Sequence, residues 1–212
     1  MPIRAVSFNI QHGRRPDGVV DVDALAASCA SFDADVLALQ EVDRETRRAG
    51  FADEAAVVAE ACDMAFAFGE ALPHYGNALL VRGGLADVEV LALPHAPDRE
   101  PRVAVLGRGA GISIACVHLG LHGDAVPQLP RVLEALCERP GPHLLIGDLN
   151  LEFEVLDVAP LTLVEPPPTF PAHRPRRRID HVAVGGLRVS RVAALPEQAV
   201  SDHRPLLVEA SS

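Results

Sequence analysis

The sequence contains no lysine and no tryptophan, and aromatic residues make up only 4% of the chain. Val, Leu and Ala must therefore fill any hydrophobic core. The sequence also lacks a run of about 20 apolar residues, the length that a membrane-spanning helix requires. Its first residues, MPIRAVSFNIQHG, contain neither an apolar targeting segment nor a small-residue cleavage site. These absences predict no membrane span and a soluble, cytoplasmic protein.

Cysteine is scarce, and the cysteines are far apart. They show no CxxC pairing and lie within apolar runs, at positions Cys29, Cys62, Cys116 and Cys137. A zinc site or a disulfide framework would place cysteines at close or regular spacing. The observed pattern predicts buried free thiols instead.

Basic residues are outnumbered, because 19 Arg against 29 Asp and Glu give a formal net charge of −10. A protein that binds long stretches of nucleic acid usually carries the opposite sign, since neutralising phosphates drives that binding. An excess of carboxylates suits a hard divalent cation instead. With 212 residues, 49% of them apolar, the chain is long enough for a single domain, 1–212, with a well-buried core.

Short apolar runs dominate the chain, and only a few helical patterns interrupt them. Apolar spacing predicts three helices, which Asp23, Asp53 and Asp124 would cap at their N-termini. Strand-like runs in the middle of the chain predict an antiparallel meander, at 78–82, 88–93, 102–106 and 112–118. Further strands are predicted at 3–8, 36–39, 143–146, 179–184, 187–193 and 205–209, and a proline-rich loop at 165–175. Many strands with few helices indicate an α+β sandwich of two packed sheets rather than a doubly wound parallel sheet.

Polar residues recur at the points where these apolar strands begin or end. Strand ends and the loops beyond them are where a rigid scaffold presents functional groups. These positions supply carboxylates, amides and imidazoles: Glu41, Asp148, Asp180, Asp202, Asn9, Asn150, His118 and His203. Each has an ordinary structural explanation on its own, since GDLN at 147–150 is a good turn sequence and a lone histidine is often a core residue. As a set, they carry the chemistry of phosphate ester hydrolysis.

That reaction needs a cation on the phosphoryl oxygens, a base for water, and donors for the developing charge. Glu41 and Asp202 offer hard oxygen ligands for Mg²⁺ or Mn²⁺. Asp148 is the candidate base for the attacking water. The candidate donors to the phosphate are Asn9, Asn150 and His118. A pairing with Asp180 would fix the tautomer of His203 and keep it cationic beside the phosphate.

Taken in order, several segments of the chain resemble a known family: SFNIQHG, LALQEVDR, YGNALL, VHL, IGDLN, RIDHV and SDHRPL. Their order is typical of the endonuclease/exonuclease/phosphatase superfamily, which includes DNase I-like nucleases, abasic-site endonucleases, sphingomyelinases and inositol polyphosphate 5-phosphatases. The resemblance extends over residues 3–205, nearly the whole chain. It implies a four-layer α/β/β/α sandwich, with two central, mostly antiparallel sheets and the active site at one edge.

The resemblance also implies a role for each matching position. Glu41 resembles the principal ligand of a Mg²⁺ (or Mn²⁺) cofactor, with Asn9 and Asp202 beside it. Asp148 resembles the water-activating carboxylate. The remaining positions match a phosphate-binding amide, an Asp–His pair, a phosphate-contacting histidine and an amide that lines the site, at Asn150, Asp180 with His203, His118 and Asn77 respectively.

The chain departs from the family pattern in two places. Many relatives carry an Arg three residues before a Gln in the segment after the HL motif, whereas Ala125 occupies the Arg position ahead of Gln128. A helical contact to the substrate or to a loop is then missing. The chain is also short for the superfamily, which implies trimmed loops for gripping DNA or an inositol head group and leaves the substrate open.

A zinc hydrolase is one alternative reading of the same segment. His118, His122 and Asp124 have the spacing of zinc ligands. However, Gly120 and Gly123 argue against a helix that would align the two histidines.

Two further alternatives concern the catalytic residues themselves. A serine hydrolase would need Ser201, Asp202 and His203 to form a relay, yet neighbours in one extended segment point in different directions. A non-catalytic phosphate-binding module of the same fold would usually have lost its base or a metal ligand. Here Glu41, Asp148 and Asp202 are all present.

A small anionic phosphoester is the preferred substrate class, because the acidic total and the short length weigh against a nuclease that grips a deep groove. An endonuclease or exonuclease acting on DNA or RNA stays open as the alternative. Arginines directly precede Asp180, at Arg174, Arg176, Arg177 and Arg178. They form either a solvated loop or a substrate-binding rim, to which we assign Arg176 and Arg178. Arginines near the first two motifs are candidates for the same rim: Arg14, Arg15, Arg44, Arg47 and Arg48. The oligomeric state and the number of metal ions are not predicted.

Overall fold

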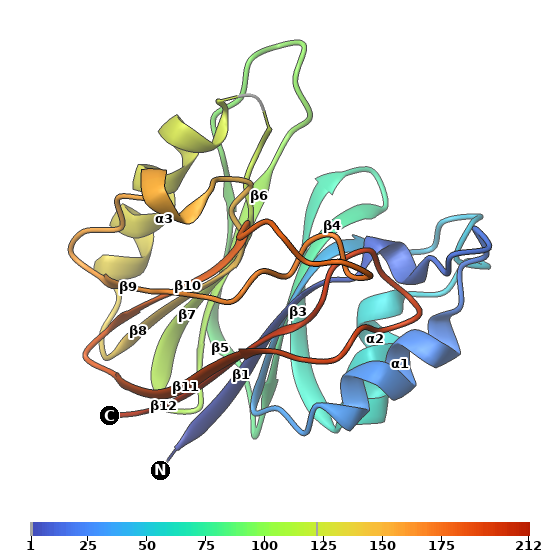
Figure 1. Cartoon of the computed structure of the whole chain (residues 1–212), viewed down its shortest axis with the longest axis horizontal. Helices are drawn as coiled ribbons and strands as arrows, with labels where there is room; N and C mark the ends of the chain where they lie inside the picture. Colours follow the sequence, from blue (N-terminus) through green and yellow to red (C-terminus); the bar gives the residue numbers. More distant parts are fainter. Residues whose placement is uncertain (1, 122) are drawn as a thin grey trace.

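The computed structural model describes residues 2–121 and 123–212 and consists of two six-stranded sheets packed face to face (Figure 1). The first sheet has the order β11-β12-β1-β2-β4-β3, with the bounds Arg188–Ala194, Leu206–Ser211, Ile3–Asn9, Val36–Asp43, Tyr75–Arg82 and Met64–Leu72. The second has the order β5-β6-β7-β8-β10-β9, with the bounds Ala86–Ala92, Val103–Gly109, Ile112–His118, His143–Asp148, Asp180–Gly185 and Thr162–Val164. One pair in each sheet is parallel, β1 with β2 and β7 with β8, and the other pairs of these strands are antiparallel.

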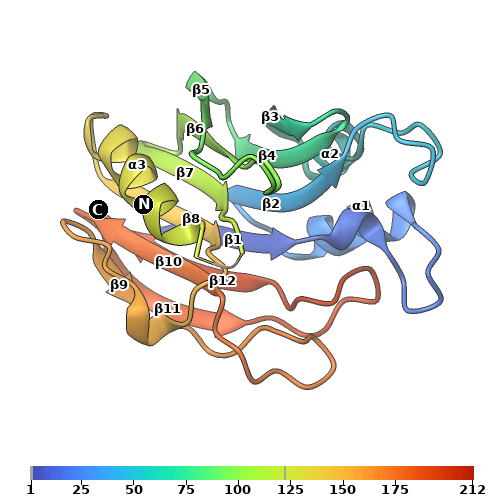
Figure 2. The ribbon, with the colours of Figure 1, turned by 90° about the horizontal axis from the view of Figure 1, so that it is seen from above.

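The α-helices cover the outer faces of the two sheets (Figure 2). Helices α1 (Val22–Ser31) and α2 (Glu54–Cys62) pack against the first sheet, and α3 (Ala125–Cys137) packs against the second. Two short 3-10 helices lie in connecting loops, η1 (Gln11–Gly13) after β1 and η2 (Phe153–Val155) after β8. The layers of the molecule are therefore stacked in the order helix, sheet, sheet, helix.

Three hydrophobic cores fill the interfaces between these layers. Phe8 of β1 meets Leu25 of α1 in the first core. Val36 of β2 and Ile146 of β8 share the second core, between the sheets. Leu136 of α3 belongs to the third core, under the outer face of the second sheet. Because the central strands are buried on both faces, they appear in the sequence as continuous apolar runs rather than as alternating patterns.

The predicted fold class, an α+β sandwich with two mostly antiparallel sheets, is confirmed. The predicted meander is correct for β5, β6 and β7, but the run 78–82 belongs to β4, which lies in the first sheet between β2 and β3. The turn at Gly83 and Gly84 resembles a hairpin in the sequence, yet the chain crosses there from one sheet to the other. An apolar run shows that a strand is buried, but it does not specify the partner strand.

The helix starts were predicted with mixed success. Asp53 caps α2 as predicted, because its side chain accepts a hydrogen bond from Ala56 N at 3.0 Å. The predicted cap at Asp23 is wrong, since Asp21 accepts from Ala24 N at 2.9 Å and Asp23 lies in the first turn of α1. Asp124 precedes α3, but its side chain makes no capping hydrogen bond. Strands β3 and β9 were not predicted, because β3 is a partly exposed outer strand and β9 has only 3 residues.

The strand directions bring the polar strand ends to one edge of the sandwich. The parallel pairs β1–β2 and β7–β8 end there with Asn9, Glu41, His118 and Asp148 near their last residues. Strand β10 runs the other way, so it begins at that edge, where Asp180 pairs with Asp148. Strands that are far apart in the sequence, from both sheets, thus present their functional side chains at the same place.

All four cysteines are free. Cys29 and Cys116 are buried as predicted, whereas Cys62 and Cys137 are only half-buried. Within the described residues, no helix combines the length and the apolar character needed to cross a bilayer.

Candidate active site

Asp148, at the end of β8, is the centre of the candidate site and is buried. Its Oδ2 lies 3.1 Å from Asn9 Nδ2, 3.6 Å from His118 Nε2 and 3.8 Å from His203 Nε2. Its Oδ1 accepts a hydrogen bond of 3.0 Å from the backbone N–H of Asn150. Three predicted phosphate-binding side chains therefore converge on one carboxylate oxygen.

Glu41 reaches the site through an irregularity in β2. The pairing of β2 with β4 shifts register between Leu39 and Val42, and Glu41 adopts the left-handed conformation with φ 58°. A bulge of this kind redirects a side chain, and such a backbone conformation is costly for a residue other than glycine. Glu41 Oε1 accepts a hydrogen bond of 3.0 Å from Asn9 Nδ2. The same amide therefore bridges Glu41 and Asp148.

The orientation of the Asn9 amide follows from its hydrogen bonds. Its Oδ1 accepts from the backbone N–H of Gln11 at 3.1 Å, so the NH₂ group must face the two carboxylates. A cation held by Glu41 would require the amide oxygen on that side instead. The predicted ligand role of Asn9 therefore needs a flip of this amide.

Asp180 and His203 form the predicted Asp–His pair, with His203 Nδ1 at 2.9 Å from Asp180 Oδ2. Thr169 donates to the same oxygen at 2.5 Å, and the ring of Phe170 lies 4.7 Å from the His203 ring. Because an ionised carboxylate only accepts, Nδ1 carries a proton and Nε2 faces Asp148. Burial alone would lower the pKa of His203, but the charge of Asp180 and its hydrogen bond, with Asp148 and Asp202, raise that pKa to about 10. His203 is therefore cationic at neutral pH.

His118 has the opposite electrostatic environment. Its Nδ1 lies 3.2 Å from a terminal guanidinium nitrogen of Arg102, which also contacts Glu100 at 3.0 Å. Because a guanidinium only donates, His118 Nδ1 must accept, and the ring proton belongs on Nε2, which points toward Asp148. Burial, Arg102 and His203 all lower the pKa of His118 well below its ordinary value. His118 is therefore a neutral donor.

Arg102 was not among the predicted site residues. It is 8% exposed, and the sequence placed it only at the start of a strand-like run. An arginine that begins an apolar run is a signal in its own right, since a buried cation needs a partner. Finding which partner it has requires the tertiary structure.

Gln128, from the family pattern after the HL motif, joins two loops at the rim of the site. It is fully buried, accepts from Gly120 N at 2.7 Å and donates to Pro94 O at 2.8 Å. These bonds connect the segment after His118 with the β5–β6 loop, which Figure 1 shows standing beyond the strand ends. Ala125, at the Arg position of the pattern, is buried and contributes no polar group.

The two remaining amides are largely engaged with backbone. Asn150 has φ 51° and donates from Nδ2 to Leu119 O at 2.9 Å, which fixes the segment after His118. Asn77 donates to Val103 O at 2.8 Å and is 3% exposed, so it joins β4 to the first residue of β6 across the two sheets. Its side chain makes no hydrogen bond to Asp148 or Glu41 within the described residues.

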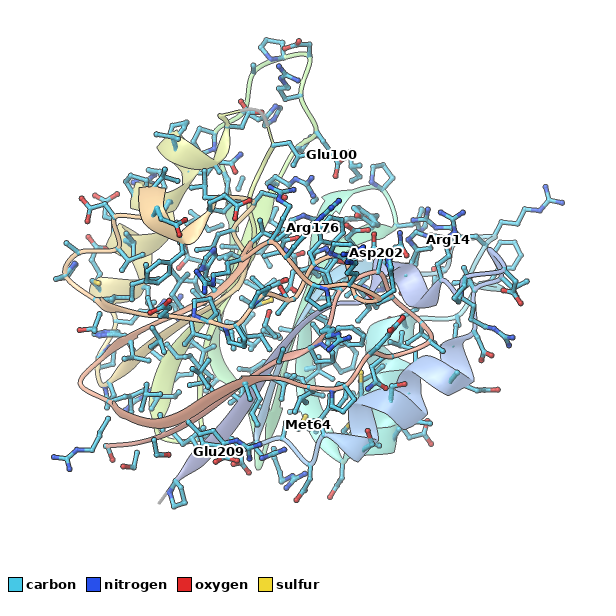
Figure 3. The ribbon with its side chains drawn as sticks, in the orientation of Figure 1. Arg14, Met64, Glu100, Arg176, Asp202 and Glu209 are labelled. Atoms are coloured by element: carbon cyan, nitrogen blue, oxygen red, sulfur yellow. The ribbon has the colours of Figure 1, made fainter. Side chains whose placement is uncertain are left out.

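Asp202 lies beside the cluster rather than within it. Its side chain makes no hydrogen bond or ion pair with Glu41 or Asn9 among the residues described here, and it lines a neighbouring cavity. Figure 3 shows Asp202 on the same side of the molecule as Arg14 and Arg176, away from Glu209. Its backbone is firmly held, since Asp202 O accepts from Ala172 N at 2.6 Å.

The predicted arginine rim divides into two parts. Arg177 pairs with Glu152 at 2.7 Å, and Arg178 lies 3.6 Å from Glu165 and 3.9 Å from Glu154. Arg178 is therefore occupied by acidic side chains and does not join the cluster. Arg176 is exposed and makes no ion pair within the described part of the chain.

The geometry disfavours the serine hydrolase and does not test the zinc hydrolase. Ser201 Oγ donates to Asn9 O at 2.6 Å and accepts from His203 N at 3.0 Å, so the hydroxyl is not activated by the His203 ring. In the zinc reading, His122 lies outside the described residues, and Asp124 is 4.0 Å from Arg99.

The charge balance of the cluster fits a divalent cation. Glu41, Asp148 and Asp180 face one cationic side chain, His203, and burial together with the charge of Asp180 raises the pKa of Asp148 to about 7. Ligand atoms of Asp148, Asp180 and His203 lie within 4.8 Å of one another. However, Asp180 and His203 Nδ1 are bonded to each other, which suits proton handling better than metal ligation. Glu41 Oε2 makes no hydrogen bond within the described part of the chain, so Glu41 is the better-placed metal ligand.

Comparison with known proteins agrees with this geometry. Residues 6–203 match the model of the Endonuclease/Exonuclease/phosphatase family. None of the curated proteins compared with the chain matches it in sequence.

Solved structures show the same fold at low sequence identity. An endonuclease/exonuclease/phosphatase from Beutenbergia cavernae is 24% identical with a TM-score of 0.76, covering 99% of this chain and 71% of the other. A family protein from Bacteroides thetaiotaomicron is 19% identical with a TM-score of 0.77, covering 99% and 97%. ANGEL2, a 2′,3′-cyclic phosphatase, is 17% identical with a TM-score of 0.73, covering 99% and 95%. With the family model matched over almost the whole chain, the protein belongs to the endonuclease/exonuclease/phosphatase family.

Proposed function

We propose that this protein is a metal-dependent phosphoesterase in which Asp148 activates the attacking water. The observation that carries the proposal is the convergence of Asn9, His118 and His203 on one oxygen of Asp148. Members of the superfamily are hydrolases that act on phosphoester bonds. The residues of this chain supply a base, donors and a carboxylate for a cation in one place.

Glu41 is the principal ligand of Mg²⁺ or Mn²⁺ in this proposal, with Asn9 and Asp202 beside it. The cation, when bound, stabilises negative charge on the phosphoryl oxygens. The excess of carboxylates over cations supports a divalent ion. Asn9 and Asp202 would have to reorient their side chains toward Glu41 to join it.

Each remaining side chain has a distinct task. Asp148 accepts a proton from water, and a pKa near 7 allows that transfer close to neutral pH. His203 stays protonated through Asp180 and donates to the phosphate. His118 donates from Nε2 as a neutral ring, because Arg102 occupies Nδ1. Asn150 orients Asp148 through its backbone N–H.

The preferred substrate is a small anionic phosphoester, bound with the help of Arg176. The net charge of −10 supports this preference over nucleic acid. A nuclease acting on DNA or RNA is the second candidate, because an exposed arginine such as Arg176 suits a backbone phosphate as well as a small phosphoester. A non-catalytic phosphate-binding module is the third.

The test is hydrolysis of bis(p-nitrophenyl) phosphate with Mg²⁺, Mn²⁺ or Zn²⁺ and with EDTA. We expect turnover with Mg²⁺ or Mn²⁺, abolished by EDTA and by Asp148→Asn, and weaker metal affinity for Glu41→Gln in a titration. Absence of turnover with every metal would favour the binding module. A parallel screen of plasmid DNA, abasic DNA, RNA, phosphoinositides, sphingomyelin and nucleotides would then separate nuclease from phosphatase.

A further inference from the structure

A cavity of about 360 Å³ opens beside the candidate site and is lined by two segments that continue from it. Gln11, on one wall, donates from its backbone to Asn9 Oδ1 at 3.1 Å. Ser201, on the other wall, donates to Asn9 O at 2.6 Å and accepts from His203 N. Since Asn9 and His203 both contact Asp148, the cavity adjoins the reacting centre. Its volume is within the range of small-molecule sites.

The cavity wall carries two arginines and a histidine, and these side chains are differently engaged. Arg15 is held by Asp17 at 3.3 Å and by Asp21 at 3.2 Å. Arg14 is exposed and makes no ion pair within residues 2–121 and 123–212, and neither does the side chain of His173. Two donors on the wall are therefore available to a ligand.

The backbone beneath these donors is fixed. Arg14 N donates to Gln11 O at 3.0 Å, and Arg14 forms a bridge with Val20. Gln11 and His12 both adopt left-handed backbone conformations, with φ 45° and φ 46°. Such conformations are costly outside glycine and persist where the surroundings impose them. The turn therefore fixes the backbone of Arg14 at the cavity wall, from which its exposed side chain extends.

Acidic side chains line the same cavity, at Glu197 and Asp202. Asp202 belongs to the proposed metal set, so a bound cation would neutralise its charge. Glu197 and Arg14 are both exposed, so solvent and salt screen the repulsion and the attraction of an anion alike. Hydrogen bonds from Arg14 and His173 at contact distance therefore decide what the cavity prefers.

A larger cavity of about 440 Å³ provides a contrast. It lies at the opposite end of the second sheet, where Ser113 is near the start of β7. Carboxylates outnumber arginines on its wall, and two of the arginines are paired with them, Arg139 with Glu89 at 2.7 Å and Arg131 with Glu134. The third arginine, Arg108, shares the wall with Asp87 and Glu138, so that cavity is less suited to an anion.

We propose that the cavity beside Asn9 binds a second anionic group of the substrate, a phosphate carried beyond the scissile ester, through Arg14 and His173. The inference rests on the proposed function and narrows it to phosphoesters that bear a further phosphate. Charge-assisted hydrogen bonds of this kind favour the anion-bearing substrate over its neutral analogue.

The experiment compares two p-nitrophenyl phosphodiesters that differ only in the second ester arm, propyl or 3-phosphonopropyl. The phosphonate cannot be hydrolysed, so only the p-nitrophenyl ester reacts. We expect kcat/KM to be about tenfold higher for the phosphonopropyl ester, and Arg14→Gln or His173→Gln to reduce that ratio. Arg188→Gln, an exposed arginine on β11 outside the cavity, is the matched control and should retain the ratio.

A ratio near one in the wild type, or a ratio unchanged in Arg14→Gln, would overturn the inference while leaving the proposed function intact. If neither ester is hydrolysed with any metal, the proposed function fails instead. Calorimetric titration with propane-1,3-bisphosphonate then decides the inference separately. Weaker binding to Arg14→Gln than to Arg188→Gln would support the anion site, and equal binding would refute it.

Discussion

Asp43 and Asp148 are both buried carboxylates at the ends of central strands, yet their surroundings differ completely. Asp43, at the end of β2, is fully buried and accepts from Arg48 Nε at 2.5 Å, from a terminal nitrogen of Arg48 at 2.7 Å and from Thr46 at 2.6 Å. Among the described residues, none is a cation bonded to both oxygens of Asp148. Its closest cationic neighbour, His203, lies 3.8 Å away and is already bonded to Asp180.

This difference separates a structural carboxylate from one that is available for chemistry. A bidentate guanidinium satisfies the Asp43 oxygens and leaves no room for a ligand. Burial and Asp180 raise the pKa of Asp148 to about 7, which suits it to proton transfer. Burial alone therefore does not mark a site, whereas burial without a matched counter-ion does.

The largest expected effect concerns Asp148, the carboxylate that no guanidinium satisfies. Asp148→Asn should lower kcat by about 10²–10⁴-fold, because a general base is lost. Its melting temperature should stay close to that of the wild type, since the amide can still accept from Asn150 N and removal of a buried charge offsets the lost hydrogen bond from Asn9. Kinetics on an activated phosphodiester and thermal unfolding measure the two effects, and a near-normal rate would contradict the role of Asp148.

Substitution of Asp43, which is paired with Arg48, should lower stability rather than turnover. Asp43→Asn places an NH₂ group against the Arg48 guanidinium and should lower the free energy of unfolding by about 2–3 kcal/mol. This loss is at or below the lower limit of about 3 kcal/mol for a broken buried ion pair, because Arg48 is partly exposed. Asp33→Asn is the control, since its ion pair with Arg82 is at the surface. Denaturant unfolding measures the loss, and turnover per folded molecule should persist. A loss of turnover as large as that of Asp148→Asn would contradict the purely structural role of Asp43.

Glu54, which lies beside Asp43, makes the stability of this region depend on pH. Its Oε2 accepts from Asp43 N at 2.7 Å, its buried Oε1 has no partner within the described chain, and burial with the charge of Asp43 raises its pKa to about 8. Glu54 therefore destabilises the fold as pH rises from the unfolded pKa near 4.5 through 8, because only the unfolded state ionises readily.

Replacing Glu54 by Gln removes that titration. The stability gain of Glu54→Gln should be small at pH 5 and on the order of 2 kcal/mol at pH 9, measured by denaturant unfolding. Glu60→Gln, on the exposed face of the same helix, should show no such pH dependence. Equal gains at both pH values would contradict the assignment.

The smallest expected effect concerns the orientation of His118. Arg102→Met frees Nδ1, so the ring proton can occupy either nitrogen, and kcat should fall by about tenfold. The loss of the Arg102 charge should also raise the pKa of His118, because that charge lowers it in the native protein. Nitrogen NMR of His118 against pH measures both changes.

The control for this variant is Glu100→Gln, which leaves the bond between Arg102 and His118 in place and should preserve the tautomer. An unchanged tautomer in Arg102→Met would show that other contacts orient the ring.

Much of the candidate site was predictable because its residues follow apolar runs. Asn9, Glu41, His118 and Asp148 could be identified in this way, since an apolar strand followed by a polar side chain is a local pattern. The bulge that redirects Glu41 could not be identified, because a register shift depends on the partner strand β4.

Arg102 is a residue of the candidate site that the sequence analysis did not identify. It precedes His118 by 16 positions, and only the pairing of β6 with β7 brings the two side chains together. Arg178 was predicted at the substrate rim, yet Glu165 and Glu154 pair with it. Competition among neighbouring charges is decided by distances that a sequence does not contain.

The sequence by itself determined which segments are buried strands and which polar residues stand at their ends, because periodicity and side-chain chemistry are local properties. Only the tertiary structure decided that Asn9 and Asp148, 139 positions apart, share a hydrogen bond. It also decided that Asp43 is neutralised by Arg48 while Asp148 is not. Contacts between the two sheets depend on strand pairing and packing over the whole chain, so they appear only when the sandwich is assembled.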